Sequence, residues 1–295
     1  MEIVSRDGGT VAEFVPEAAM LCCSLTVDGE QLLDAGQGVE AYAERGKTMG
    51  VPLLYPWANR LAEFAYSAGG KEVQLPDDRS RVPADPNGLP IHGVIPNLMP
   101  FEAGAREDGV LAGRLDWSTP KLLELFPYAH EVSLEARVDN GRLTIAATVR
   151  ASGQDRVPIS FGFHPYLRLP GGRDSCRLTF PPAEHLILDE RMLPTGAAEP
   201  APEGELELAD RVFDDAFKPH RQPARYAVAA AGREIGLELQ EGFPYSQVYA
   251  PEGKDFICFE PMTAPANALR SGEGLMLLEP GDTYRAVFTV TSSNA

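Results

Sequence analysis

The sequence contains few cysteines, and their spacing argues against a metal site. Its 295 residues include four, namely Cys22, Cys23, Cys176 and Cys258, and no two of them form a Cys-x-x-Cys pair. A structural zinc site needs clustered Cys or His ligands, so we expect neither a metal site nor a metal cofactor. The thiols are expected to be reduced and buried in strands of a cytoplasmic protein.

Basic residues are also scarce. The chain has 26 Lys and Arg against 43 Asp and Glu, which gives a formal charge of −17. Proteins that bind nucleic-acid backbones use clustered Lys and Arg to displace counterions from phosphates, so we expect no nucleic-acid partner. An anionic membrane surface is disfavoured for the same reason. The net charge does not exclude a small anionic ligand, because one local pair of arginines can bind a phosphate on an acidic protein.

Long apolar runs and nucleotide motifs are missing as well. No stretch approaches the ~18 consecutive apolar residues of a membrane-spanning helix. Residues 1–15 carry three acids and no apolar run, so they match neither a secretory signal nor a transit peptide, and we expect a cytoplasmic location. The sequence lacks a P-loop, a dinucleotide-binding glycine pattern and a Gly-x-Ser-x-Gly nucleophile elbow.

Alternation of apolar and polar residues with period 2 dominates the rest of the chain. Residues 132–138 and 143–149 alternate on either side of Asp139–Arg142, which predicts a β-hairpin. Similar signals cover residues 25–29, 226–239 and 284–290. The longest stretch with helical character is Lys121 to Phe126, about one turn between two prolines.

These short strands, with turns between them and no alternating helices, predict an all-β fold, a large antiparallel β-sandwich. Pro and Gly are spread evenly along the chain, and the loosest segment, Gly196 to Gly204, does not resemble an interdomain linker. We therefore expect residues 1–295 to form a single domain.

Two of the five histidines lie in irregular segments rich in glycine and proline. His92 lies in residues 87–93 and His164 in residues 160–166. We expect such positions to expose a side chain at a loop edge, where functional residues are common. For either histidine alone, a hydrogen bond to the loop backbone is an equally good interpretation. The other three are expected to be solvated or packing residues: His130, His185 and His220.

A glutamate and an arginine complete the candidate chemistry. Glu260 ends an apolar stretch that begins at Phe256, where a carboxylate costs free energy unless it is paired or used. Arg60 ends the aromatic-rich residues 50–60 and offers a planar fork of donors to a sugar or a carboxylate, with a surface ion pair as the alternative. Two histidines and a glutamate suit proton transfer by general acid and base. Reference pKa values of about 4.3 for Glu and 6.5 for His predict that a carboxylate base and a histidine acid coexist near neutral pH with modest tuning.

Taken in order, several segments resemble motifs of the aldose 1-epimerase (galactose mutarotase) family, over most of the chain. They are Pro-x-Leu-x-Pro-Trp-x-Asn-Arg at residues 52–60, Asn-Gly-Leu-x-x-His-Gly at 87–93, Phe-Gly-x-His-Pro-Tyr at 161–166, Pro-Thr-Gly at 194–196, Ser-Gln-Val-Tyr at 246–249 and Glu-Pro-x-Thr at 260–263. The motifs agree with the family in identity, order and spacing.

The resemblance implies a β-supersandwich that binds a sugar in a cleft on its concave face. It implies that Glu260 is the general base for the anomeric hydroxyl and His164 the general acid for the ring oxygen. His92 would hold the charge that shifts as the ring opens. The residues implied to bind sugar hydroxyls are Arg60, Asn59, Asp214 and Gln247. No metal or organic cofactor is implied, because only protons move.

The sequence departs from the family pattern at two places. The family's aspartate is usually followed by histidine, whereas Asp214 is followed by Asp215, so either could be the sugar-binding acid. Many relatives carry a tryptophan after the His-Gly pair, and residues 94–100 contain none, which affects the expected shape of the pocket. Sugar-phosphate epimerases tend to carry an arginine just after this pair, and Val94–Pro96 supply none.

The implied activity is the interconversion of the α and β anomers of a free aldohexose such as glucose or galactose. The partner would be this small sugar, and the protein a monomer or homodimer. A hexose-6-phosphate 1-epimerase is the closest alternative, and a sugar-binding or sensing protein without turnover is another. The presence of Glu260, His92 and His164 together argues against the last, since a binding protein does not need both an acid and a base.

Overall fold

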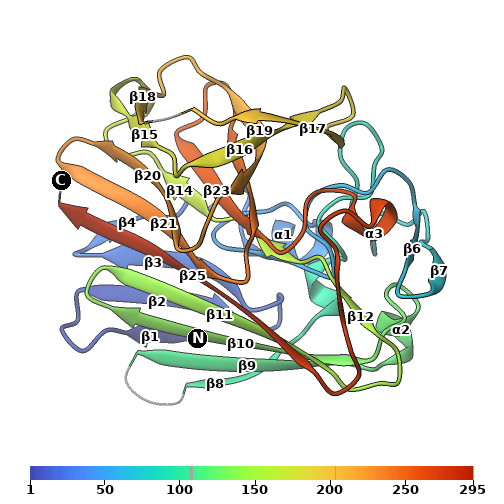
Figure 1. Cartoon of the computed structure of the whole chain (residues 1–295). Helices are drawn as coiled ribbons and strands as arrows, with labels where there is room; N and C mark the ends of the chain where they lie inside the picture. The colour runs from blue at the N-terminus through green and yellow to red at the C-terminus, as the bar shows by residue number, and fades with distance from the viewer. Residues whose placement is uncertain (106–108, 203, 295) are drawn as a thin grey trace.

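The computed structural model describes residues 1–105, 109–202 and 204–294. Most of this chain is β-strand, and its two large antiparallel sheets pack against each other (Figure 1). The prediction of an all-β antiparallel sandwich is confirmed.

One sheet has nine strands in the described chain, and it pairs strands that are far apart in the sequence. Its order is β18 (Glu205–Glu207), β15 (Arg177–Thr179), β20 (Ala224–Ala230), β21 (Arg233–Glu241), β25 (Thr283–Asn294), β11 (Arg142–Ala151), β10 (His130–Asp139), β9 (Val110–Trp117) and β8 (Glu102–Ala105). The last strand, β25, therefore lies beside β11 from the middle of the chain (Figure 1).

The other large sheet has eight strands in the described chain and carries Asp214, Gln247 and Glu260. Its order is β17 (Pro194–Pro200), β16 (Ala183–Leu188), β19 (Phe213–Pro219), β22 (Tyr245–Ala250), β23 (Phe256–Met262), β13 (Gly162–Phe163) and β5 (Leu53–Leu54), and β14 (Tyr166–Arg168) also pairs with β23.

Smaller elements surround the two sheets. The first strands form a sheet in the order β1 (Glu2–Val4), β2 (Thr10–Val15), β3 (Leu21–Val27) and β4 (Glu30–Gln31). Two strand pairs are β6 (Ala65–Ala68) with β7 (Lys71–Gln74) and β12 (Val157–Ile159) with β24 (Met276–Leu278). The short helices are α1 (Val39–Arg45), α2 (Pro120–Leu123), α3 (Ala268–Ser271), η1 (Pro96–Leu98) and η2 (Arg173–Ser175).

The predicted hairpins form as the alternation indicated. Strands β10 and β11 pair along their whole length around the Asp139–Arg142 turn. Strands β20 and β21 pair in the second predicted hairpin, and β3 and β4 flank Asp28 and Gly29. In each case the apolar set of a strand lies on one face because successive side chains point to opposite faces.

Aromatic side chains fill the space between the two large sheets. The rings of Phe163 and Phe288 lie 4.9 Å apart, and those of Tyr226 and Phe259 lie 5.4 Å apart and stack. The largest cluster of buried apolar residues extends from Ile3 to Val290. Because Phe259 packs against the nine-stranded sheet, the next residue, Glu260, points to the opposite face of its own sheet.

Two local predictions were wrong. The longest helix of the described chain is α1, with seven residues, whereas α2 has four. Helix α1 is set by its flanking glycines and by the burial of Ala41 and Tyr42, and it is too short for a helical period to emerge in the sequence. The cysteines are free, but Cys23 is half-buried and Cys176 lies outside any strand. No helix among the described residues is long and apolar enough to span a membrane.

Candidate active site

Three adjacent strands bring polar side chains to one face of the eight-stranded sheet. Glu260 on β23 lies directly opposite Gln247 on β22, and Asp214 on β19 lies opposite Tyr249. Residues two apart on a strand share a face, so all four side chains line the face turned away from the other large sheet. The alternating pattern therefore gathers side chains from distant parts of the sequence.

Glu260 and His164 form a buried acid–base pair. His164 Nε2 lies 3.1 Å from Glu260 Oε1, and the two side chains are 6% and 2% exposed. Tyr166 stacks on the His164 ring with a centroid distance of 4.5 Å, and its hydroxyl lies 2.6 Å from Thr48 Oγ1. His164 is thus held from one side by the carboxylate and on its ring face by the tyrosine. It is not exposed at a loop edge as its sequence context predicted.

Burial shifts the proton equilibria of this pair strongly. Desolvation raises the pKa of Glu260 well above its usual value, with Asp214 adding to the rise and Arg60 opposing it. Desolvation also lowers the pKa of His164 to about 3. Both shifts favour the neutral form of each group, a protonated carboxyl and an unprotonated imidazole, and the 3.1 Å contact lets the two groups share that one proton. The modest tuning predicted from reference pKa values is wrong, because both groups lie out of water.

Arg60 is held above this pair by acidic groups on two sides. Its Nε donates to Asp85 Oδ2 at 2.8 Å, and its Nη2 lies 3.6 Å from Asp214 Oδ2. Gln247 Nε2 in turn donates to Asp214 Oδ1 at 2.7 Å. Asn59 accepts hydrogen bonds from the backbone N–H and Nη1 of Arg60 with its side-chain oxygen. These contacts place Arg60, Asn59, Asp214 and Gln247 in one network.

Strand alternation places Asp214 and Asp215 on opposite faces of the sheet. Asp214 faces Arg60 and Gln247, whereas Asp215 points to the other face and lies 3.1 Å from His185 Nε2. Asp214 is therefore the acid within reach of a ligand at Glu260.

His92 approaches the pair from the loop that precedes η1. Its ring meets that of His164 edge-on at 5.4 Å, and its backbone has a positive φ of 61°. Burial, His164 and Arg60 together lower the pKa of His92 well below its usual value. The next residue must be glycine, since a Cβ on Gly93 would lie 1.9 Å from the carbonyl oxygen of Tyr55.

Three buried polar atoms at this place have no hydrogen-bond partner in the described chain: His92 Nδ1, His164 Nδ1 and Glu260 Oε2. Buried polar atoms are normally satisfied. Their concentration around one carboxylate indicates a site that receives hydrogen bonds from a ligand or from water.

Sequence reasoning missed three residues that shape the site. Asp85 binds Arg60, and its signal was the Asp-Pro-Asn-Gly turn sequence. Tyr249 meets the His164 ring edge-on at 5.9 Å, within a motif already recognised for its glutamine. Asn267 donates its backbone N–H to the Arg60 carbonyl at 2.7 Å and accepts from Ala62 N–H with its side chain at 2.9 Å, and no local pattern marked it.

The remaining histidines serve packing or surface contacts. His130 is fully buried, its Nδ1 lies 2.6 Å from the Tyr128 carbonyl, and its Nε2 contacts the Tyr55 hydroxyl. His185 lies between Glu199 and Asp215, on the sheet face opposite the site. His220 is exposed, as expected. In the described part of the chain, no group of three or more His, Cys, Asp or Glu is arranged to hold a metal ion.

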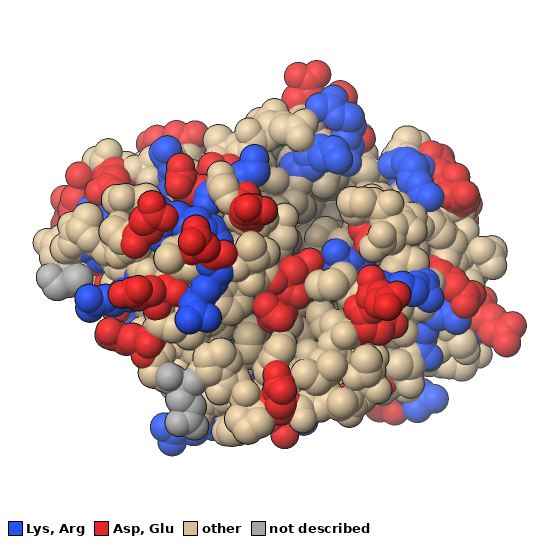
Figure 2. Space-filling view, turned by 90° about the horizontal axis from the view of Figure 1, so that it is seen from above, with Lys and Arg blue, Asp and Glu red and all other residues tan. Residues whose placement is uncertain are grey.

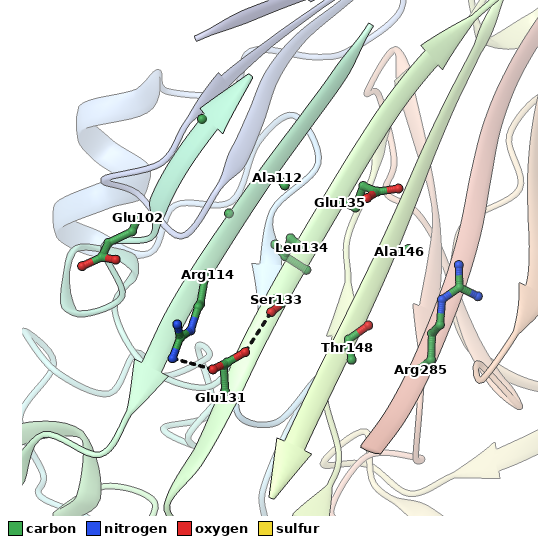
Figure 3. A pocket seen from close by; sticks show the side chains of 12 residues that line it. Glu102, Ala112, Arg114, Glu131, Ser133, Leu134, Glu135, Ala146, Thr148 and Arg285 are labelled. Atoms are coloured by element: carbon green, nitrogen blue, oxygen red, sulfur yellow. Dashed lines mark hydrogen bonds and ion pairs between the residues drawn. The ribbon is translucent and has the colours of Figure 1, made fainter. Parts of the chain in front are cut away.

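The surface is hollowed in several places. Viewed from above, one hollow lies near the middle of the molecule, with acidic and basic side chains at its margin (Figure 2). A second, of about 640 Å³, lies on the outer face of the nine-stranded sheet (Figure 3). Its Arg114 and Glu131 pair at 2.6 Å, and its lining includes none of the predicted site residues. The predicted site residues therefore lie away from this second hollow.

The sequence model described as aldose 1-epimerase matches residues 18–291. The chain belongs to the aldose 1-epimerase family. Galactose mutarotase of Mus musculus is 26% identical over 266 residues, covering 77% of this chain and 74% of that protein. The uncharacterized protein YihR of Escherichia coli (strain K12) is 26% identical over 256 residues, covering 81% and 77%.

Several solved structures share this fold. A galactose mutarotase-like protein from Clostridium acetobutylicum superposes with a TM-score of 0.83 at 20% identity, covering 98% of this chain and 94% of that chain. A protein from Synechocystis gives a TM-score of 0.80 at 25% identity, covering 100% and 96%. The resemblance inferred from the motifs and the galactose mutarotase-like architecture are thus confirmed.

Proposed function

We propose that this protein is a cytoplasmic mutarotase that interconverts the α and β anomers of a free aldohexose such as glucose or galactose. The observation that carries the proposal is the buried Glu260–His164 contact of 3.1 Å, with Glu260 Oε2 and His164 Nδ1 lacking hydrogen-bond partners among the described residues. A base and an acid this close can act on two oxygens of one sugar, the anomeric hydroxyl and the ring oxygen. Membership of a family that includes a galactose mutarotase supports it.

Only protons and one C–O bond change in the reaction. With the shared proton of the pair on His164, Glu260 accepts the proton of the anomeric hydroxyl, and the freed electron pair forms the aldehyde C=O. The C1–O5 bond breaks, and its electrons go to the ring oxygen, which takes a proton from His164. After rotation about C1–C2, the ring closes on the other face, His164 recovers its proton and Glu260 returns the other. The pair ends each turnover as it began, so no external proton donor is required.

The surrounding residues would bind and orient the sugar. An ion pair joins Arg60 to Asp214 and a hydrogen bond joins Gln247 to Asp214. Such groups suit hydroxyls, which both donate and accept. Asn59 holds Arg60, and His92 would stabilise the charge that moves during ring opening. By orienting the sugar, these residues would increase the rate, because the anomeric hydroxyl and the ring oxygen are then held next to Glu260 and His164.

A hexose-6-phosphate 1-epimerase is the less favoured enzyme. Asp85 and Asp214 already flank Arg60, and Val94–Pro96 offer no arginine for a phosphate. A sugar sensor without turnover is also less favoured, because burying a carboxylate beside a histidine costs free energy that binding alone does not require.

A polarimetric assay with freshly dissolved α-glucose, α-galactose and glucose 6-phosphate tests the proposal. We expect acceleration of at least one free hexose over the buffer rate, with little on the phosphate, and the same rate after treatment with a chelator. Calorimetric titration of the same sugars separates the alternatives. Binding without acceleration would favour the sugar-sensor function over the enzyme. Faster conversion of glucose 6-phosphate than of the free sugars would favour a hexose-6-phosphate 1-epimerase.

A further inference from the structure

One carboxylate anchors both Arg60 and the loop that carries His92. The Asp85 side chain is 2% exposed, and its Oδ2 accepts from Arg60 Nε at 2.8 Å. Its other oxygen, Oδ1, accepts from the backbone N–H groups of Asn87 and Leu89, each at 2.9 Å. A charge-assisted bond to a nearly buried carboxylate is among the stronger hydrogen bonds in proteins.

The backbone continues the same connection. Leu61 N–H donates to the Pro90 carbonyl at 2.9 Å, and His92 N–H donates to the Asn59 carbonyl at 3.0 Å. The strand-like bridge between these segments therefore places His92 beside Arg60. Movement of Asp85 would displace the guanidinium and the His92 loop together.

Asp85 also balances the charge of Arg60. The groups that surround Arg60 are Asp85, Asp214, Glu260, His92 and His164. Burial is the main cause of the shifted pKa values of Glu260 and His164, and the positive charge of Arg60 lowers both. Loss of the Asp85 charge would leave this positive charge less compensated next to the pair.

We propose that Asp85 is a positioning residue: by holding Arg60 it fixes where the sugar hydroxyls bind and sets the electrostatic potential at the Glu260–His164 pair. The inference rests on the proposed mutarotase function. Asp85 touches no reacting atom in this scheme and acts through Arg60.

The test compares Asp85→Asn with a matched variant, Asp189→Asn. Asn retains an acceptor for the two backbone N–H groups, so the turn persists while the negative charge that faces Arg60 is lost. Asp189 accepts the same two kinds of backbone hydrogen bond, from Arg191 and Leu193, at 2.8 and 3.0 Å, but its side chain is exposed. This control therefore makes the same chemical change in the same kind of turn.

For Asp85→Asn we expect the KM for galactose to rise about 10- to 100-fold, with a smaller fall in kcat. The pH–rate profile should move to lower pH by about half a unit to one unit, because less compensated positive charge lowers the pKa of both groups. Asp189→Asn should match the parent in KM, kcat and pH profile. Asp85→Glu should recover part of the loss, since it restores the charge.

A structural role alone would lower the active fraction, and hence kcat, with an unchanged KM and pH profile, and that result would overturn the proposal. The proposal also fails if the two asparagine variants behave alike. If the parent binds galactose without turnover, the proposed activity fails, and the effect on the Kd of each variant then decides the role of Asp85. A parent that neither turns over nor binds a free hexose would refute both.

Discussion

Two five-residue loops of this molecule, Asp85–Leu89 and Asp189–Leu193, have the same local structure. In each, the aspartate N–H donates to the carbonyl of the fifth residue, at 2.9 and 2.8 Å. The side-chain Oδ1 accepts from the N–H groups two and four residues later. The fourth residue has a positive φ in both, 80° at Gly88 and 63° at Met192.

The two loops differ in what lies beyond them. The Asp85 carboxylate is nearly buried and bound to Arg60, whereas Asp189 is exposed and forms no ion pair in the described part of the chain. The turn follows from local sequence, because an aspartate can bond to its own backbone. The expected role of Asp85 follows from its burial and from its ion pair with Arg60. Buried and exposed residues of the same type should therefore differ in the same way elsewhere in the molecule, and the following predictions compare such pairs.

The largest difference in rate is expected between variants of two histidine–carboxylate pairs. His164 contacts Glu260 in a buried setting, whereas His185 contacts Asp215 in a half-exposed one. His164→Asn should slow anomer conversion by roughly 10²–10⁴-fold, because the ring oxygen would leave without a proton. His185→Asn should leave the rate within about twofold. Polarimetry on both variants checks this, and equal losses would contradict the contrast.

Two arginines provide the next comparison. Arg60→Ala should weaken galactose binding and lower the free energy of unfolding by about 3 kcal/mol, because Asp85 would remain buried without its cation. Arg191 is exposed and donates to the Ala62 carbonyl at 2.5 Å, so Arg191→Ala should cost about 1 kcal/mol or less. Urea denaturation and calorimetric titration measure the two effects. Similar losses of stability would refute the importance of the Asp85 partner.

Histidine burial predicts a difference in acid sensitivity. The Tyr128 carbonyl can only accept, so neutral His130 donates from Nδ1 and accepts at Nε2 from Tyr55, and burial lowers its pKa to about 4. The unfolded chain then binds more protons below about pH 6.5, so stability present above that pH is lost as pH falls toward 4.

His130→Phe should therefore show a smaller drop in unfolding free energy between pH 7 and 4.5, by about 2 kcal/mol relative to the parent. The matched change at exposed His220, His220→Phe, should leave the drop unchanged. Urea unfolding at both pH values provides the measurement. An unchanged drop in the His130 variant would show that this histidine does not titrate in the window.

The smallest effect concerns the backbone beneath Arg60. Asn267 has a φ of 66° and bonds to the main chain on both sides of Leu61. Asn267→Asp keeps the acceptor, Asn267→Gly keeps the backbone freedom, and Asn267→Ala loses both, so stability should fall in that order, by about 1–2 kcal/mol for Ala. Asn140→Ala, at an exposed turn with φ 35°, should lose less. A rank order with Asp below Ala would contradict the assigned hydrogen bond.

Much of the fold could be predicted because its hairpins are local. The turn at Asp139–Arg142 and the alternation beside it determine β10 and β11 without any distant contact. Strand β19 itself, and with it the opposite faces of Asp214 and Asp215, was not among the predicted hairpins. Alternation could not tell which face holds the site, because that depends on the strands paired with β19.

The site was harder to predict where tertiary contacts decide it. The motifs named Glu260 and His164, and the apolar stretch before Glu260 indicated a carboxylate that needs a partner. The residues around His164 gave no sign that it would be buried against Glu260. The pairing of Asp85 with Arg60 joins residues 25 positions apart in different loops. Such contacts are set by how loops pack on the sheet, and residue pattern alone does not encode them.

The central claim is that Glu260 accepts the anomeric proton, and exchange NMR on equilibrated galactose measures that step directly. The parent should exchange the α and β anomers faster than buffer. Glu260→Gln, which keeps the shape but not the base, should lower the enzymatic exchange by roughly 10²–10⁴-fold with galactose still bound. Parent-like exchange in Glu260→Gln, or a parent that binds galactose without exchanging it, would contradict the claim.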